Sequence, residues 1–459
     1  MVSTRSGSTK VPEGVERDDN RIIAVVTGAN SGFGLGICQQ LLSNLSLPVG
    51  SSIPASTPQS TAMPPSLRSS FKTSSSKEKA KAKEEIADPP ATLTLILACR
   101  SQSKAEEAKQ ILLTIHEKDL KNRIDRGEKV RTGWKEGLRI EWQGLDLDNP
   151  GGGNGVLGFC ERLKEKYPHV TTLYLNAGMG AFTGLDWWMF FKQTMLEGMI
   201  RAQSLPKYQM EEKGAMSSDG ERGLVWGTNV LAPYIIVKEL IPLLKRSPPS
   251  LPFQPRVIYT SSLTSRYSTL HSSPLNDYQL IDYPNSYSPS KYMGDLVMTE
   301  FDRAYGTTPT STTTAILSPK VTVQEKDRPI RFFTVDPGCV CTNFFSSGMG
   351  VIMWWANVKF FFYWLSFYLC RLLGSPHHPV YADQGALPMI YAALISDEYI
   401  LPAEKNPAQR FAVMSSRWGK TAVGYEEVDR WEQGEDIGKG VVEACEAHRK
   451  EWRRRGGLE

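Results

Sequence analysis

The sequence predicts an α/β fold: a doubly wound parallel sheet with helices on both faces, built as a single domain with large insertions. Short apolar runs rich in β-branched residues alternate with longer segments of helical periodicity, the pattern of repeated strand–helix–strand units. The first run, 22–27, leads directly into a glycine-rich turn. The chain has 459 residues, 41% of them apolar, so it can bury a large core. A ligand is expected at the carboxyl ends of the strands.

The apolar runs place the strands, and the periodic segments between them place the helices. The first strand is the unbroken apolar run from Ile22 to Val26, and the second runs from Leu93 to Ala98. We expect strands near 22–27, 92–98, 138–143, 171–176, 255–261, 330–335 and 410–415. We expect helices near 34–43, 103–117, 155–166, 222–246, 286–304 and 382–395.

The excess length lies between these elements, which favours one domain over 21–445. Residues 1–20 form a polar tail without the apolar stretch of a signal peptide. Residues 43–90, rich in Ser and Pro, carry too little apolar surface to fold alone, so we expect a disordered insertion, either functional or a plain surface loop. A basic C-terminal tail is expected at 446–459, and further insertions at 118–137, 179–220, 263–285 and 305–328.

Charge and cysteine content exclude some classes of function. The net charge is only +4 on 53 basic and 49 acidic residues, too balanced for a nucleic-acid-binding protein. The seven cysteines form no C-x-x-C pair, so we expect no metal site and reduced thiols that face the cytosol.

The segment from Thr27 to Gly34 predicts a dinucleotide site. Gly28 allows a tight turn, Gly32 lets the backbone approach a pyrophosphate, and Gly34 lets the next helix pack closely on the sheet. The helix N-terminus then faces the phosphates. The spacing Gly-x-x-x-Gly-x-Gly differs from the general Rossmann pattern, and glycine turns also occur for purely structural reasons.

Tyr287 and Lys291 are four residues apart, so they lie on one face of a helix that begins near Tyr287. A nearby ammonium lowers the pKa of a phenol, which favours proton transfer at neutral pH. About one such pair is expected by chance. Upstream, the strand 255–261 delivers Ser262 to the same edge of the sheet, where it can bond a carbonyl group or simply form a turn.

Together these motifs resemble the short-chain dehydrogenase/reductase family, whose fold is a Rossmann-type sheet. The family's Asn-Ala-Gly, helix asparagine, catalytic serine and Tyr-x-x-x-Lys motifs match Asn176-Ala177-Gly178, Asn229, Ser262 and Tyr287 with Lys291. Its Thr-Gly-x-x-x-Gly-x-Gly and Pro-Gly-x-Val-x-Thr motifs match Thr27 to Gly34 and Pro337-Gly338 with Val340 and Thr342.

The resemblance implies a role for each matched residue. Tyr287 protonates the carbonyl oxygen as hydride arrives from a nicotinamide, Lys291 lowers its pKa and holds the ribose, and Ser262 orients the carbonyl. Asn229 holds a water that relays protons to Lys291. Two positions depart from the family: Ser262 and Tyr287 are 25 residues apart, about twice the usual gap, and Leu175 replaces an asparagine.

NADPH is the cofactor that the sequence favours. The second strand ends in Cys99-Arg100-Ser101, without the carboxylate that would hold the 2′-hydroxyl of NAD. Arg100 can pair with a 2′-phosphate, with Lys104 as a helper, or be a solvated strand end. Asp146 resembles the family's adenine-contacting acid. The full predicted cofactor set is Thr27, Gly28, Asn30, Ser31, Gly32, Phe33, Gly34, Arg100, Lys104, Asp146, Asn176, Ala177, Gly178, Tyr287, Lys291, Pro337, Gly338, Val340 and Thr342.

Within 344–376, the aromatic segment 351–370 is long enough to span a bilayer. Its aromatic residues are spread through it and Lys359 is central, so an interfacial helix or a shallow hairpin fits better than a crossing. The alternative is a lid over an apolar substrate. A second cluster, 187–191, lines the same cleft or is ordinary core.

Within the family, the chain resembles the fungal sterol 3-ketoreductase branch of ergosterol synthesis, related to 17-beta-hydroxysteroid dehydrogenase type 7. This implies reduction of a 4-demethylated 3-ketosterol to the 3-beta-alcohol, on the cytosolic face of the endoplasmic reticulum or on lipid droplets, beside other C-4 demethylation enzymes. The alternatives are a reductase of another lipid carbonyl, such as retinal, a 17-ketosteroid or a long-chain ketone, and a non-catalytic NADP-binding scaffold.

Overall fold

The structure is a computed structural model that describes residues 18–46, 92–128, 130, 136–251, 253–307, 328–342 and 353–458. The predicted insertion 43–90 lies outside the described residues from 47 onward, as do residues 1–17 of the predicted N-terminal tail. Residues 343–352, at the start of the predicted lid, also lie outside them.

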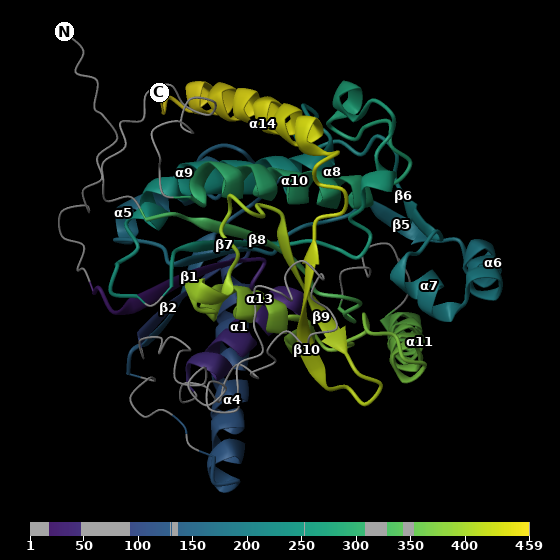
Figure 1. The fold of residues 1–459 in the computed structure, drawn as a ribbon, viewed down its shortest axis with the longest axis horizontal. Coiled ribbons are helices and arrows are strands. Elements are labelled where there is room, and N and C mark those ends of the chain that lie inside the picture. Colours follow the sequence, from purple (N-terminus) through teal and green to yellow (C-terminus); the bar gives the residue numbers. More distant parts are fainter. Residues whose placement is uncertain are drawn as a thin grey trace.

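The described strands form an eight-stranded sheet in the order β10-β9-β8-β7-β4-β1-β2-β3 (Figure 1). It is parallel from β3 to β9, and β10 runs antiparallel to β9. The chain runs outward from β1 to β3 and then crosses to β4, so the strand order reverses between β1 and β4. The predicted doubly wound sheet and its seven strands are therefore confirmed, and β10 is an addition. The strands are β1 Arg21–Thr27, β2 Thr92–Cys99, β3 Leu138–Gly144, β4 Thr172–Leu175, β7 Arg256–Thr260, β8 Arg331–Asp336, β9 Gln409–Ser415 and β10 Thr421–Glu427.

Two apolar layers hold helices on the two faces of the sheet. Successive residues of β1 point to opposite faces, so Ile22 and Val26 pack in one layer and Ile23 and Val25 in the other. The first layer carries α1 (Gly32–Leu45), α4 (Gln102–Asp125), α12 (Ala382–Gly385) and α13 (Leu387–Leu394). The second carries α5 (Val156–Lys166), the helix formed by α8 (Leu224–Trp226), η1 (Gly227–Leu231) and α9 (Ala232–Lys245), and α10 (Tyr287–Tyr305).

The helix Leu224–Lys245 is long and apolar enough to cross a membrane, but 83% of its most apolar window is buried inside the protein. It packs against α5 and α14, so it is a core helix here.

The last helix, α14 (Glu435–Arg455), forms a third layer over α9 and α10 (Figure 1). Trp452 is buried in it, and Arg449 and Arg453 pair with the buried Glu239 of α9 at 2.6 and 2.8 Å. The prediction of a separate basic tail at 446–459 is therefore wrong up to Leu458, because one face of this segment is apolar and its arginines meet a carboxylate.

The insertion 179–220 folds into a small unit beside the main sheet. Strands β5 (Phe182–Leu185) and β6 (Gln209–Glu211) pair antiparallel, and between them lie α6 (Trp187–Glu197) and α7 (Met199–Ser204). Helix α11 (Met353–Leu372) contacts α7, so α6, α7 and α11 gather at one end of the molecule (Figure 1). The short helices η2 (Tyr267–Thr269), η3 (Pro274–Asp277) and η6 (Asp397–Tyr399) lie in connecting segments.

Candidate active site

A cavity of about 630 Å³ opens at the carboxyl ends of the parallel strands, where the strand order reverses. This is the place where ligands bind in open α/β sheets. Most of the predicted site residues meet in its wall: Gly28, Asn30, Ser31, Gly32, Phe33, Gly34, Arg100, Asp146, Asn176, Ala177, Gly178, Ser262, Tyr287, Lys291, Pro337, Gly338, Val340 and Thr342. Thr27, Lys104 and Asn229 do not line it.

The turn after β1 has the geometry of a phosphate cradle. Gly28 and Gly32 have φ angles of +67° and +53°, which side-chain-bearing residues rarely adopt. A Cβ at Gly34 would lie 2.2 Å from the carbonyl oxygen of Gly28, so only glycine lets α1 begin this close to β1. The first residues of α1, Gly32 to Gly34, line the cavity, and N–H groups in the first turn of a helix have no acceptor within the helix.

Thr27 stands behind this turn and joins the ends of β1 and β4. Its hydroxyl accepts hydrogen bonds from the backbone N–H groups of Asn176 and Ala177, each at 2.9 Å. The side-chain amide of Asn176 donates to the carbonyl of Thr27, also at 2.9 Å. Thr27 is thus placed to hold the cavity wall in shape rather than to touch a ligand.

The end of β2 brings a basic side chain and no carboxylate to the cavity wall. Arg100 is exposed and lines the cavity, and no carboxylate follows β2 before α4 begins at Gln102. Asp146 lines the cavity beside the end of β3 and accepts a hydrogen bond from the backbone N–H of Asp148 at 3.2 Å. Lys104 is exposed, and its backbone N–H donates to the hydroxyl of Ser101, the N-cap of α4, so its helper role stays a prediction.

Three reactive side chains meet at the other end of the cavity. Tyr287 opens α10, Lys291 lies one turn later, and Ser262 follows β7. Lys291 donates from Nζ to the carbonyl of Thr260 at 2.9 Å and lies 5.8 Å from the ring centre of Tyr287. The hydroxyl of Tyr287 and that of Ser262 are hydrogen-bonded.

The electrostatics correct one expectation. Burial raises the pKa of Tyr287 above its usual value, the bond with Ser262 lowers it, and Asp336 raises it. The predicted fall of this pKa below 10 is therefore wrong in direction, because burial outweighs the hydrogen bond with Ser262. Burial also lowers the pKa of Lys291 to about 8, against the opposing charge of Asp295.

Asn229 lies behind the catalytic residues, within the π-helical turn η1. Its side-chain amide accepts from the N–H of Met179 at 2.8 Å and donates to Met179 O and Ser290 Oγ at 2.7 and 2.9 Å. Its backbone carbonyl accepts from the hydroxyl of Tyr259 at 3.0 Å. A Cβ at Gly178 would lie 2.9 Å from Asn229 Oδ1 and 3.1 Å from Lys291 Nζ, so this glycine leaves room for both.

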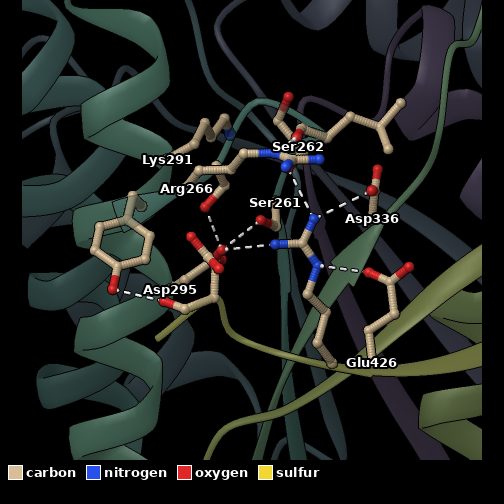
Figure 2. A network of polar contacts seen from close by, with 12 residues as sticks. Ser261, Ser262, Arg266, Lys291, Asp295, Asp336 and Glu426 are labelled. Atoms are coloured by element: carbon tan, nitrogen blue, oxygen red, sulfur yellow. Dashed lines mark hydrogen bonds and ion pairs between the residues drawn. The ribbon is translucent and has the colours of Figure 1, made fainter. Parts of the chain in front are cut away.

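A buried ionic network that the sequence analysis missed supports this end of the cavity. Figure 2 shows five residues of this network: Ser261, Ser262, Asp295, Asp336 and Glu426. Its centre is the guanidinium of Arg410 on β9, which is bonded to the carbonyl of Ser262 at 2.8 Å, to Asp336 at 3.1 Å and to Asp295 at 3.2 Å.

Asp295 extends this network along α10, one turn after Lys291. Its Oδ2 also accepts hydrogen bonds from the hydroxyls of Ser261 and Ser265, at 2.6 and 2.5 Å. The network therefore ties α10 to the ends of β7 and β8 just below the reactive groups.

No family model matches the chain, but curated proteins do. It is 24% identical to the 3-keto-steroid reductase ERG27 of Saccharomyces cerevisiae over 410 residues, which cover 89% of this chain and 90% of that protein. It is 24% identical over 459 residues to the 3-keto-steroid reductase erg27 of Aspergillus fumigatus, covering 96% and 88% of the two chains. The chain is a homologue of fungal 3-keto-steroid reductases. The relation to 17-beta-hydroxysteroid dehydrogenase type 7 stays a prediction.

Among solved structures, salutaridine reductase from Papaver somniferum aligns with a TM-score of 0.44 and 16% identity, covering 82% of this chain and 97% of that one. An alcohol dehydrogenase from Thermococcus sibiricus complexed with 5-hydroxy-NADP aligns with a TM-score of 0.41 and 14% identity, covering 86% and 96%.

The insertion and α11 also contribute to the cavity wall. Gln203, Pro206 and Tyr208 come from the insertion, and Tyr363 and Phe367 come from α11. Of the predicted aromatic cluster 187–191, Trp187, Trp188 and Phe191 are exposed on α6, so they are neither core nor cavity wall. No group of His, Cys, Asp or Glu among the described residues is arranged to hold a metal ion.

Proposed function

We propose that this protein reduces the ketone of a 3-ketosteroid to the alcohol with NADPH. The observation that carries the proposal is the meeting of Ser262, Tyr287 and Lys291 in one cavity with the phosphate cradle after β1. The fungal 3-keto-steroid reductases that align over most of the chain support the substrate class.

The described residues fit NADPH. The positive-φ turn and the start of α1 offer backbone N–H groups to a pyrophosphate, and the exposed Arg100 offers a fork of donors to a 2′-phosphate. When bound, NADPH supplies a hydride to the carbonyl carbon of the ketone.

The side chains of this protein supply the rest of the reaction. Ser262 donates a hydrogen bond that orients the ketone oxygen, and Tyr287 transfers its proton to this oxygen as negative charge develops there. The positive charge of Lys291 and the hydroxyl of Ser262 stabilise the tyrosinate that remains. Hydride and proton together convert C=O to CH–OH, so the products are the alcohol and the oxidised nicotinamide.

A 4-demethylated 3-ketosterol is the substrate we assign, with the 3-beta-alcohol of ergosterol synthesis as product. The aromatic side chains of Tyr363 and Phe367 in the cavity wall suit the apolar rings of a sterol. The enzyme would act on the cytosolic face of the endoplasmic reticulum or on lipid droplets, beside the other C-4 demethylation enzymes.

A lipid surface is the partner that the exposed apolar residues favour. Trp188 on α6 is 77% exposed and Phe362 on α11 is 62% exposed, on helices at the same end of the molecule (Figure 1). Tyr363 and Phe367 of α11 line the cavity, so contact between α11 and a bilayer would place the cavity next to a lipid substrate in that bilayer. We expect W188E combined with F362E to reduce cosedimentation with phosphatidylcholine vesicles at least tenfold. I124E, at an exposed residue of α4, is the control and should bind as the wild type does.

The test of the activity is NADPH oxidation by the purified protein with a panel of 3-ketosterols, 17-ketosteroids, retinal and long-chain ketones. The 3-ketosterols should give the highest kcat/KM, with 3-beta-alcohol as the product. A preference for another member of the panel would replace the substrate assignment, and NADPH binding without turnover of any ketone would show a non-catalytic scaffold.

A further inference from the structure

The start of the helix that carries Tyr287 is capped by a residue from a distant part of the chain. Ser286 occupies the N-cap position of α10 but makes no capping bond with its own side chain. Instead, Oε2 of Glu211 on β6 accepts hydrogen bonds from the backbone N–H of Ser286 at 2.8 Å and of Tyr287 at 3.1 Å. It also accepts one from the hydroxyl of Ser286, at 2.8 Å. A carboxylate is favourable here because helix N-termini carry unpaired N–H groups and partial positive charge.

The same small sheet holds the side chain of Tyr287. Phe182 on β5 is the ladder partner of Glu211. Its ring centre lies 5.5 Å from that of Tyr287, tilted by 53°. The cross-strand pair of Phe182 and Glu211 therefore contacts both the ring and the backbone of Tyr287.

We propose that Glu211 is a positioning residue for Tyr287: its carboxyl group fixes the first turn of α10 and places a negative charge beside the backbone of the tyrosine. This inference rests on the proposed ketone reduction.

The charge of Glu211 is separable from its hydrogen bonds. All three donors contact Oε2, whereas Oε1 is buried and finds no hydrogen-bond partner in the described part of the chain. Glutamine can offer one oxygen to the same donors, so the packing of this site does not require a carboxylate. Burial raises the pKa of Glu211 above its usual value, and the hydrogen bonds from Ser286 and Tyr287 only partly offset this rise.

Other groups also act on Tyr287, and they remain in place when Glu211 is changed. Ser262 bonds its hydroxyl and lowers its pKa, while Asp336 at the end of β8, Glu211, and Asp295 on α10 raise it. Tyr259 of β7 is also close enough to interact, and Lys291 lies against the ring. Removing the charge of Glu211 therefore shifts the titration of Tyr287 in one direction, toward lower pH.

The experiment compares E211Q and E211A in the full-length protein, with E212Q as the matched control. Glu212 is the adjacent residue and is exposed. Because the tyrosine must be protonated to donate, ketone reduction falls as pH rises through its pKa. We expect the high-pH limb of kcat in E211Q to move to lower pH, with kcat at neutral pH within about threefold of the wild type. In E211A the cap is lost as well, and kcat should fall roughly 10- to 100-fold. E212Q should match the wild type.

The outcomes separate this inference from the proposed function. A pH profile of E211Q that superimposes on that of the wild type overturns the inference, even if E211A melts at a lower temperature. If the wild type reduces no ketone, the proposed function fails. In that case, ultraviolet difference titration of tyrosinate in the wild type and in E211Q measures the shift in the titration of Tyr287, and Y287F identifies which part of the signal belongs to Tyr287.

Discussion

Replacing Gly34 with alanine tests whether the turn after β1 holds a nucleotide. The new Cβ would lie 2.2 Å from the carbonyl oxygen of Gly28 and 2.7 Å from Nδ2 of Asn176. A non-bonded carbon must lie roughly 1 Å farther from that carbonyl oxygen. Because the oxygen belongs to the backbone, α1 must move away from β1. Such overpacking costs about 1–3 kcal/mol of stability. The same movement withdraws N–H groups from the phosphates, where each charged hydrogen bond contributes about 1.5–3 kcal/mol. We expect the Kd for NADPH to rise by roughly 10- to 100-fold.

The assay is a fluorescence titration with NADPH, combined with urea unfolding to measure stability. G184A is the control, because a Cβ at Gly184 on β5 would meet nothing within 4 Å. It should bind NADPH like the wild type. If G34A is correctly folded and binds NADPH with unchanged affinity, the nucleotide does not lie against this turn, and the assignment of the cavity to NADPH is refuted.

Two further predictions follow from the buried charges below the site. R410M leaves Asp295 and Asp336 buried without their counter-charge, which should cost about 3–5 kcal/mol of unfolding free energy, whereas R410K should lose less. Urea unfolding of both variants measures this, and equal stability would contradict it. For Lys291, burial lowers the pKa from 10.5 to about 8, so its charged form destabilises the folded state by about 3 kcal/mol below pH 8, and this penalty fades as pH rises to 10.5. K291M should therefore abolish turnover but unfold at a higher urea concentration than the wild type at pH 7, and the difference should be smaller near pH 10. If K291M is less stable than the wild type at pH 7, the hydrogen bond from Lys291 to Thr260 contributes more to stability than the buried charge costs.

The strands and the cavity residues were predictable because their signals are local. The run from Ile22 to Val26 is apolar at every position, since both faces of this central strand are buried. The positive φ angles at Gly28 and Gly32 and the close backbone contact at Gly34 favour glycine, so these positions are recognisable in the sequence. Tyr287 and Lys291 share a helix turn, so their proximity also follows from spacing.

The misses share a different cause, because each depends on contacts between distant segments. β10 is the partly exposed edge strand, and Gly424 interrupts its pattern. Arg410 lay in a predicted strand, but nothing local indicates that its guanidinium meets Asp295 and Asp336. Glu211 belongs to an insertion whose fold the sequence did not predict.

The same reason accounts for the pKa of Tyr287. The spacing to Lys291 suggests a lowered value, but the direction is decided by burial, which depends on the tertiary structure. Likewise, the run of basic residues predicts a tail at 446–459. The apolar face with Trp452 and the carboxylate of Glu239 on α9, which is distant in sequence, make it a packed helix.

The most direct measurement is the comparison of Y287F with the wild type in two assays, NADPH binding and single-turnover reduction of a 3-ketosterol. The substitution removes only the hydroxyl that contacts Ser262, so NADPH affinity should stay within about threefold while reduction falls by at least about 100-fold. Reduction by Y287F at the wild-type rate would contradict the role of Tyr287 as proton donor.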